Sequence, residues 1–266
     1  MKPSLRTARN TVLESISGAS SGRALLVAVL TSMLYSSGGL AAEPRVLVLN
    51  DVNEPPYTNA ERTGFLDIIA TEAFRRAGLE LRLVKLPAER ALLLANDGIE
   101  DGDLTRIPGL EAQYLNLIRV PEKLADWDFV ALSKDASIPA SVEAIRGRSV
   151  GLIRGWKIYE RAMAGAGRVV MVKDSEQLFR LLELDRIEVA LYARAMGLAR
   201  MGKHGDKDVR VLEPSLYRRE MFIYLHKRHA TYVPKLASAL RAMKQDGTYQ
   251  RAHDETLLPY IGVSPR

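Results

Sequence analysis

The sequence predicts an α/β fold of two lobes, because the order strand–helix–strand–helix–strand occurs twice along the chain. Parallel strands need helical crossovers, so each repeat predicts a parallel sheet with helices on its faces. Two alternating stretches, residues 128–134 and 220–227, flank the second repeat and predict the strands that connect the lobes. We therefore expect one lobe at residues 42–130 plus 226–266 and the other at residues 131–225.

The first repeat begins with a β-rich apolar run at residues 45–50. A helix over residues 65–77 follows, with apolar residues on one face and Gly78 as its stop. Alternating leucines predict a strand at residues 79–86. Pro87 and Gly98 then bracket a second helix, and DGDLTRI (residues 101–107) reads as the third strand.

The second repeat has the same order. SVGLI (residues 149–153) and RVVMV (residues 168–172) predict strands, separated by a helix that ends in glycines. Asp174 or Ser175 is expected to cap the next helix, and residues 187–192 predict the last strand. The amphipathic segment 233–252 predicts one C-terminal helix that returns to pack on the first lobe.

The first 41 residues have the pattern of a secretory signal. Basic residues precede an apolar run at residues 24–34, and small residues follow it. A membrane anchor is the alternative, but a spanning helix needs about 20 apolar residues. We expect cleavage after Ala41 and a periplasmic location. Removing four basic residues and one acidic residue with the signal lowers the formal net charge from +6 to +3.

Composition excludes several classes of function. The chain has no cysteine, which excludes a disulfide scaffold, a thiol nucleophile and a cysteine zinc site. No dense Lys/Arg stripe points to nucleic acid. His226 and His229 have no carboxylates at metal-ligand spacing, so we expect no metal. Motifs such as HExxH, GxSxG or a P-loop do not occur, and no cofactor is expected.

Ligands of open α/β sheets bind outside the carboxyl ends of the strands. The residues at those ends are therefore the candidate binding residues: Asn50, Asp51, Tyr57, Arg90, Thr105 and Arg106 in the first lobe, and Arg154, Gly155, Trp156, Lys157 and Tyr192 in the second.

Arg106 ends the third strand of the first repeat and is expected to face the cleft. A guanidinium there can hold a carboxylate or another planar oxyanion bidentately, with Arg154 adding positive potential. The alternative is a salt bridge or a strut at the lobe edge.

The other candidates have similar alternatives. Gly155 lets backbone approach, and the helix that starts there offers N–H groups to an anion. Trp156 is expected to stack on a ligand or to belong to the core. Lys157 is a ligand contact or a solvated helix charge. Tyr57 is a lid aromatic or packs within its loop.

The stretches EPPYT, TGFLDIIATEAFRRAG, IEDGDLTR, SVGLIRGWK, RIEVALY and HKRHATYVPKLASALRAMKQDGTY resemble solute-binding family 3, over about residues 43–262. This family contains type II, two-lobed periplasmic receptors of ABC transporters for polar amino acids. The resemblance implies capture of a small solute by lobe closure and delivery to an ABC permease or a membrane sensor protein. We expect a monomer that uses no cofactor.

Two positions depart from the family pattern. Its amino-acid receptors carry an arginine for the α-carboxylate about a dozen residues after the aspartate of the third strand, where this chain offers Gln113 and Tyr114. Ala193 stands where the family often has an aspartate for the α-ammonium. Both ends of the amino-acid clamp are missing, so we expect a small polar solute, anionic or amino-acid-like, with Arg106 making an anionic contact.

Two other classes of function are weighed against binding. A dehydratase or hydrolase on this fold would need an acid and a base at the cleft, and Glu54, Asp67 and Glu89 are the nearby carboxylates. Asp67 and Glu89 fit the first turns of their helices instead, so we expect a non-enzyme. A ligand-independent interaction protein is the third alternative.

Overall fold

The structure is a computed structural model that describes residues 45–52 and 54–261. The expected signal segment and its cleavage after Ala41 lie outside these residues. Within the described ranges, no helix has both the length and the apolar character needed to cross a membrane.

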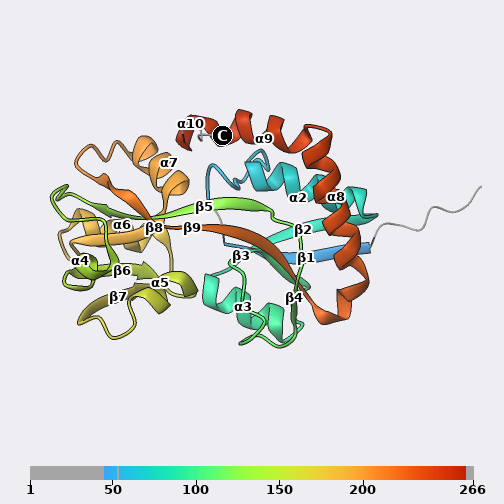
Figure 1. The fold of residues 1–266 in the computed structure, drawn as a ribbon, viewed down its shortest axis with the longest axis horizontal. Helices are drawn as coiled ribbons and strands as arrows, with labels where there is room; N and C mark the ends of the chain where they lie inside the picture. Colours follow the sequence, from blue (N-terminus) through green and yellow to red (C-terminus); the bar gives the residue numbers. More distant parts are fainter. Residues whose placement is uncertain (1–44, 53, 262–266) are drawn as a thin grey trace, which may run out of the picture. The chain divides into compact units, whose positions relative to one another are not determined.

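The first lobe is built as its repeat predicts. Its three parallel strands have the order β2-β1-β3, and the two helices are the crossovers between them (Figure 1). These elements are β1 (Arg45–Asp51), α2 (Phe65–Arg76), β2 (Leu79–Lys85), α3 (Ala88–Asn96) and β3 (Gly102–Arg106).

Helix α2 buries the apolar face that the sequence predicts, including Leu66, Ile69 and Phe74. Asp67 lies in its first turn, where its carboxylate accepts hydrogen bonds from the backbone N–H groups of Gly64 and Asn59, at 3.1 and 3.0 Å. These hydrogen bonds satisfy backbone amides at and before the start of the helix. They confirm the prediction that Asp67 belongs to the first turn of its helix.

The second lobe repeats the arrangement. Its parallel strands have the order β8-β6-β7, and Asp174 caps α6 by accepting from the amide of Gln177 at 2.9 Å. The elements are α4 (Val142–Arg146), β6 (Ser149–Ile153), α5 (Lys157–Ala162), β7 (Arg168–Val172), α6 (Ser175–Glu183), β8 (Val189–Ala193) and α7 (Arg194–His204). The sequence interpretation did not anticipate the helices α4 and α7.

Strands β5 (Ala125–Ser133) and β9 (Arg210–His226) join both lobes into one sheet, in the order β2-β1-β3-β9-β5-β8-β6-β7 (Figure 1). The short β4 (Leu117–Arg119) adds to β9. Both connecting strands begin earlier than predicted, at Ala125 and Arg210. The added part of β9 pairs with β5 but is largely exposed, so it has no apolar alternation to reveal it.

The prediction of one continuous helix over residues 233–252 was wrong. The 3-10 turn η1 (Lys227–Tyr232) leads into α8 (Val233–Gln245), and α9 (Thr248–Thr256) and α10 (Leu258–Ile261) follow. Gly247 has φ +79°, a left-handed conformation that ends the first helix and starts the next. Helix α8 packs on α2 of the first lobe, as expected.

In each parallel sheet, an acidic side chain just before the third strand accepts a hydrogen bond from a backbone amide of the first strand. In the first lobe, Asp101 accepts from the amide of Val48 in β1 at 2.7 Å. The same carboxylate lies 2.5 Å from the Arg228 guanidinium and 2.6 Å from Nε2 of the buried His229. Burial raises the pKa of Asp101, but these donors outweigh it and hold the pKa below its usual value.

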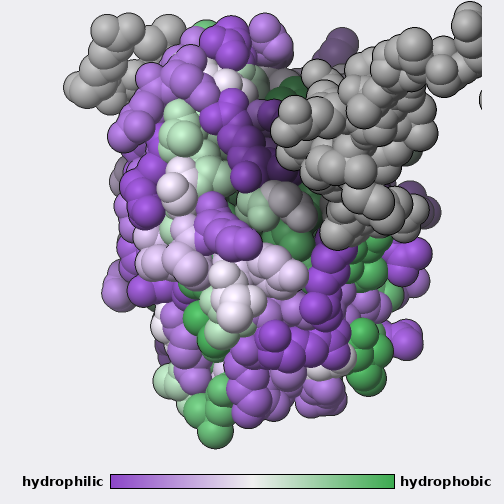
Figure 2. All heavy atoms as spheres, turned by 90° about the vertical axis from the view of Figure 1, so that its right-hand side faces the viewer, coloured by the Kyte–Doolittle hydropathy of each residue, from purple (hydrophilic) through white to green (hydrophobic). Residues whose placement is uncertain are grey.

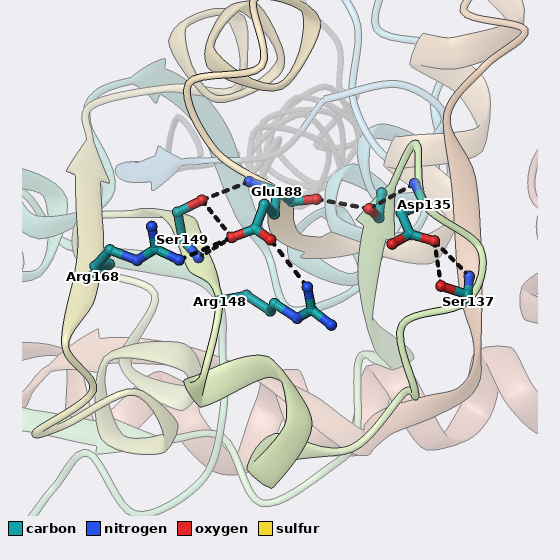
Figure 3. Close-up of polar contacts among 7 residues, drawn as sticks. Asp135, Ser137, Arg148, Ser149, Arg168 and Glu188 are labelled. Atoms are coloured by element: carbon teal, nitrogen blue, oxygen red, sulfur yellow. Dashed lines mark hydrogen bonds and ion pairs between the residues drawn. The ribbon is translucent and has the colours of Figure 1, made fainter.

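In the second lobe, Glu188 has the corresponding place before β8. Its carboxylate accepts from the Ser149 amide at 2.8 Å and the Ser149 hydroxyl at 2.9 Å (Figure 3). Arg148 and Arg168 lie 3.2 and 3.3 Å away, and the Ser149 amide is the largest cause of the lowered pKa of Glu188. Both carboxylates thus satisfy first-strand amides where strand pairing is short.

The surface drawn in Figure 2 is mainly hydrophilic, and its hydrophobic residues form small separate patches. Scattered apolar side chains of this kind are normal for a protein surface.

We predict that Asp101→Asn lowers the free energy of unfolding by about 1–3 kcal/mol at pH 7, because a charged acceptor for buried donors is lost. The native pKa of Asp101 is lowered, so its contribution is present above the unfolded pKa of about 3.9 and disappears as pH falls. Denaturant unfolding from pH 7 to pH 3 should show the difference from wild type shrinking. A difference that stays constant with pH would contradict this, and the exposed Asp208→Asn is the control.

Candidate functional site

The carboxyl ends of the two parallel sheets meet across a cleft, and the lobes are in direct contact there. Gly155, after β6, lies so close to α3 that a Cβ atom at this position would be 2.3 Å from the amide nitrogen of Glu89. Lys157 from the second lobe lies 2.6 Å from the Glu89 carboxylate, and 2.9 Å from Glu160 of its own helix. Gly155 and Lys157, two of the residues expected at a binding cleft, therefore contact the opposite lobe.

Arg106 ends β3 at the centre of this contact and is almost completely buried. Its Nη2 atom lies 2.7 Å from Oδ2 of Asp103 and donates to the carbonyl of Ala88 at 2.8 Å. Its Nη1 atom donates across the cleft to the carbonyl of Gly155 at 3.4 Å. The Nε–H group is buried and finds no acceptor among the described residues. Arg106 thus acts as a strut between the lobes and leaves its buried Nε–H group without an acceptor among the described residues.

Asp103, the ion-pair partner of Arg106, is fully buried. Burial raises the pKa of this carboxyl group, and the Arg106 guanidinium counteracts part of that effect. Nearby Asp51, at the end of β1, acts in the same direction as burial. A buried ion pair contributes little net stability, but a buried carboxylate that loses its cation is strongly destabilising.

Aromatic rings fill the space next to Arg106. Trp156 stacks on Tyr192, with ring centroids 5.1 Å apart and an interplanar angle of 12°. The rings of Trp127 and Phe129 from β5 lie beside that of Trp156, with ring centroids 6.1 and 6.2 Å away. The rings leave a cavity of about 30 Å³ beside Arg106, room for about one water molecule.

A second cavity, of about 220 Å³, shares Trp156 with the first. It combines aromatic, acidic, hydroxyl and basic groups, and its lining includes Trp156, Tyr192, Glu54, Ser175, Lys85 and Lys173. A wider groove of about 770 Å³ shares several of these residues. The 220 Å³ cavity has the mixed polarity of a small-molecule site, and it is smaller than the roughly 300–1,000 Å³ typical of such sites, which suits only a small solute.

Glu54 connects the lobes at this second cavity. It lies in the loop after β1, and its two carboxylate oxygens are 2.7 and 2.8 Å from the Ser175 hydroxyl. The Tyr192 hydroxyl donates to the same carboxylate at 2.9 Å. Ser175 begins α6 and Tyr192 belongs to β8, so both hydroxyls come from the second lobe.

The predicted site residues fall into three groups. Thr105, Arg106, Gly155, Trp156 and Lys157 line the small cavity, and Trp156 and Tyr192 line the larger one. Asp51 is buried at the end of β1, and Tyr57 is buried with its ring 4.8 Å from that of Trp127. Arg90 and Arg154 are exposed.

Sequence reasoning gave no binding role to several residues of the cleft, among them Trp127, Phe129, Ser175 and Glu54. Trp127 lies before the predicted connecting strand and Phe129 within it, where an aromatic residue reads as core. Ser175 was assigned only a capping role, and Glu54 was weighed only as a catalytic carboxylate. The one signal that could have found Glu54 is its place in the loop that leaves β1 at the carboxyl end.

No family model matches this sequence. An uncharacterized protein of Shewanella oneidensis is 24% identical over 193 residues, which cover 70% of this chain and 73% of that protein. The chain is similar in structure to an ancestral arginine-binding protein bound to arginine (18% identity, TM-score 0.70, 80% of this chain and 99% of that chain). It is also similar to a histidine kinase sensor domain with similarity to periplasmic binding proteins (16% identity, TM-score 0.71, 84% and 99%). The chain therefore has the two-lobed fold of the family 3 solute-binding proteins, as the sequence predicted.

We predict that Gly155→Ala prevents the lobes from meeting. The new Cβ would collide with the backbone of Glu89, and φ at this residue is +88°, a conformation that disfavours alanine. Small-angle X-ray scattering should show a larger radius of gyration, and tryptophan emission should shift to the red as Trp156 becomes hydrated. Gly167→Ala is the matched control, since its Cβ would meet no heavy atom within 4 Å. Unchanged scattering and emission in Gly155→Ala would refute the prediction.

We predict that Arg106→Met lowers the free energy of unfolding by about 3–5 kcal/mol, because Asp103 is left buried without its cation. Adding Asp103→Asn should recover most of this loss, as the double variant has no buried charge at this place. Chemical denaturation of the three variants (each single change and the pair) measures the effect. If the double variant is no more stable than Arg106→Met, the ion pair does not carry the stabilisation.

Proposed function

We propose that this chain is a solute-binding protein that captures a small polar solute by closing its two lobes. The observation that carries the proposal is the convergence of both sets of strand ends on one cleft, with polar groups from each lobe reaching the other. Ligands of open α/β sheets bind at such ends. The cavities of the cleft have aromatic walls and a few charged groups, as small-molecule sites do.

The solute we propose is polar and either anionic or amino-acid-like. The unused Nε–H group of Arg106 supports an oxygen ligand, because a buried donor without an acceptor costs free energy. The other charged groups beside Arg106 already have partners, since Arg106 pairs with Asp103, and Lys157 pairs with both Glu89 and Glu160. A solute with one carboxylate and further polar groups suits this arrangement.

We further propose that the protein acts in the periplasm, after cleavage of the N-terminal segment near Ala41, and that its closed form is recognised by an ABC permease or a membrane sensor protein. The sequence pattern of the first 41 residues supports export. The similarity to a sensor domain makes sensing an output to test beside transport. Strand β5 pairs with β8 from Phe129 on, and β9 pairs with β3 from Phe222 on, which supports lobe boundaries near those proposed.

The carboxylates weighed for catalysis support binding over enzymatic chemistry. Asp67 caps a helix, Glu89 forms an ion pair with Lys157, and Glu54 accepts from two hydroxyls. None of these contacts gives the acid–base arrangement that a dehydratase or hydrolase needs.

Tryptophan fluorescence tests the proposal directly, because the chain has two tryptophans and both line the small cavity. The mature protein is titrated with amino acids, mono- and dicarboxylates, sugars and polyamines, and its melting temperature is followed in parallel. A ligand at a hundred times its Kd should stabilise the protein by about 2.7 kcal/mol. We expect carboxylate-bearing solutes to change both signals and Trp156→Phe to remove most of the emission change. No response to any solute class would overturn solute binding.

A further inference from the structure

Two buried hydroxyls of the second lobe donate to the same carboxylate in the cleft. Ser175 and Tyr192 are both more than nine-tenths buried, and their oxygens lie within 2.9 Å of one carboxylate, that of Glu54. The first turn of α6 holds Ser175. The Tyr192 ring is held by stacking on Trp156 and by an edge contact with Phe179. The two donors are thus fixed by the second lobe and do not depend on Glu54 for their positions.

The carboxylate between these donors belongs to the opposite lobe. Glu54 reaches them from the loop after β1, and no cation of the described residues lies within ion-pair distance of it. This differs from Glu89, which meets Lys157 across the same cleft. Hydroxyl donors compensate a partly dehydrated carboxylate in place of a counter-charge.

The same two hydroxyls border the 220 Å³ cavity, so a small molecule has room beside them. Lys85 and Lys173 also line this cavity and add positive charge from both lobes. When the lobes separate, Glu54 must leave with the first lobe, and the two donors remain on the second.

We propose that Ser175 and Tyr192 form a carboxylate-binding subsite of the second lobe, and that Glu54 is an internal carboxylate that competes with the solute for it. The inference rests on the proposed function and deepens it, because it assigns the solute a carboxylate and a place to bind. Glu54 closes the cleft by occupying the subsite, and a solute carboxylate must displace it. The apparent affinity for the solute is then the intrinsic affinity multiplied by the fraction of molecules in which the subsite is free.

Removing Glu54 should therefore strengthen carboxylate binding. We expect Glu54→Ala to bind succinate or acetate about tenfold or more tightly than wild type, as measured by calorimetry and by the emission of Trp156. Glu54→Gln, which keeps the size of the side chain and loses its charge, should give a smaller gain. Succinamide, which has the shape of succinate without its charge, should show no gain.

Adding Ser175→Ala to Glu54→Ala should remove the gain, because one of the two donors is lost. Glu61→Gln, an exposed acidic residue of the same loop, is the matched control and should behave as wild type. Cooperative thermal unfolding of each variant shows that it is folded.

Three results would overturn the subsite. One is unchanged or absent succinate and acetate binding in Glu54→Ala. Another is a gain that survives Ser175→Ala. The third is binding of putrescine by wild type that Glu54→Ala abolishes, since Glu54 would then hold a cationic solute. If wild type binds a solute of the wider panel but Glu54 has no influence, the proposed function stands and this inference fails.

Discussion

The buried guanidinium of Arg106 links the two lobes through hydrogen bonds and is held by an ion pair. It pairs with the buried Asp103, and it reaches backbone carbonyls of Ala88 in the first lobe and Gly155 in the second. Because Asp103 is removed from water, the cation cannot leave without a large cost in stability. The contact also requires a glycine at position 155, since the backbones approach too closely for a side chain. Charge and backbone proximity together define the closed cleft.

Each parallel sheet is secured at the opposite end from the cleft. Asp101 and Glu188, from equivalent places in the two repeats, accept amide hydrogens of the first strands. These carboxylates continue the hydrogen bonding where the pairing of first and third strands covers two residues. Rigid sheets of this kind can hold strand-end side chains in position.

The cleft holds two cavities of different chemistry. Aromatic rings around Trp156 pack beside the Arg106 strut and leave a cavity of about 30 Å³ there. Hydroxyls, lysines and Glu54 line the cavity of about 220 Å³. The charged side chains beside Arg106 form ion pairs, whereas the Glu54 carboxylate is held by two hydroxyls. A solute can therefore take over polar groups most readily in the larger cavity.

Strand and helix periodicity are local properties, so the sequence predicted the order of elements within each repeat, the two parallel sheets and the residues at their carboxyl ends. It also placed Arg106, Trp156 and Tyr192 at the cleft, since each ends, follows or belongs to a strand. What these residues touch depends on the tertiary fold. Glu54 meets Ser175 and Tyr192 across 121 and 138 residues of chain, and no local pattern encodes such a contact. The exposed half of β9 was missed because it has no apolar alternation, and the break at Gly247 was missed although a glycine that follows a helix is a local stop signal.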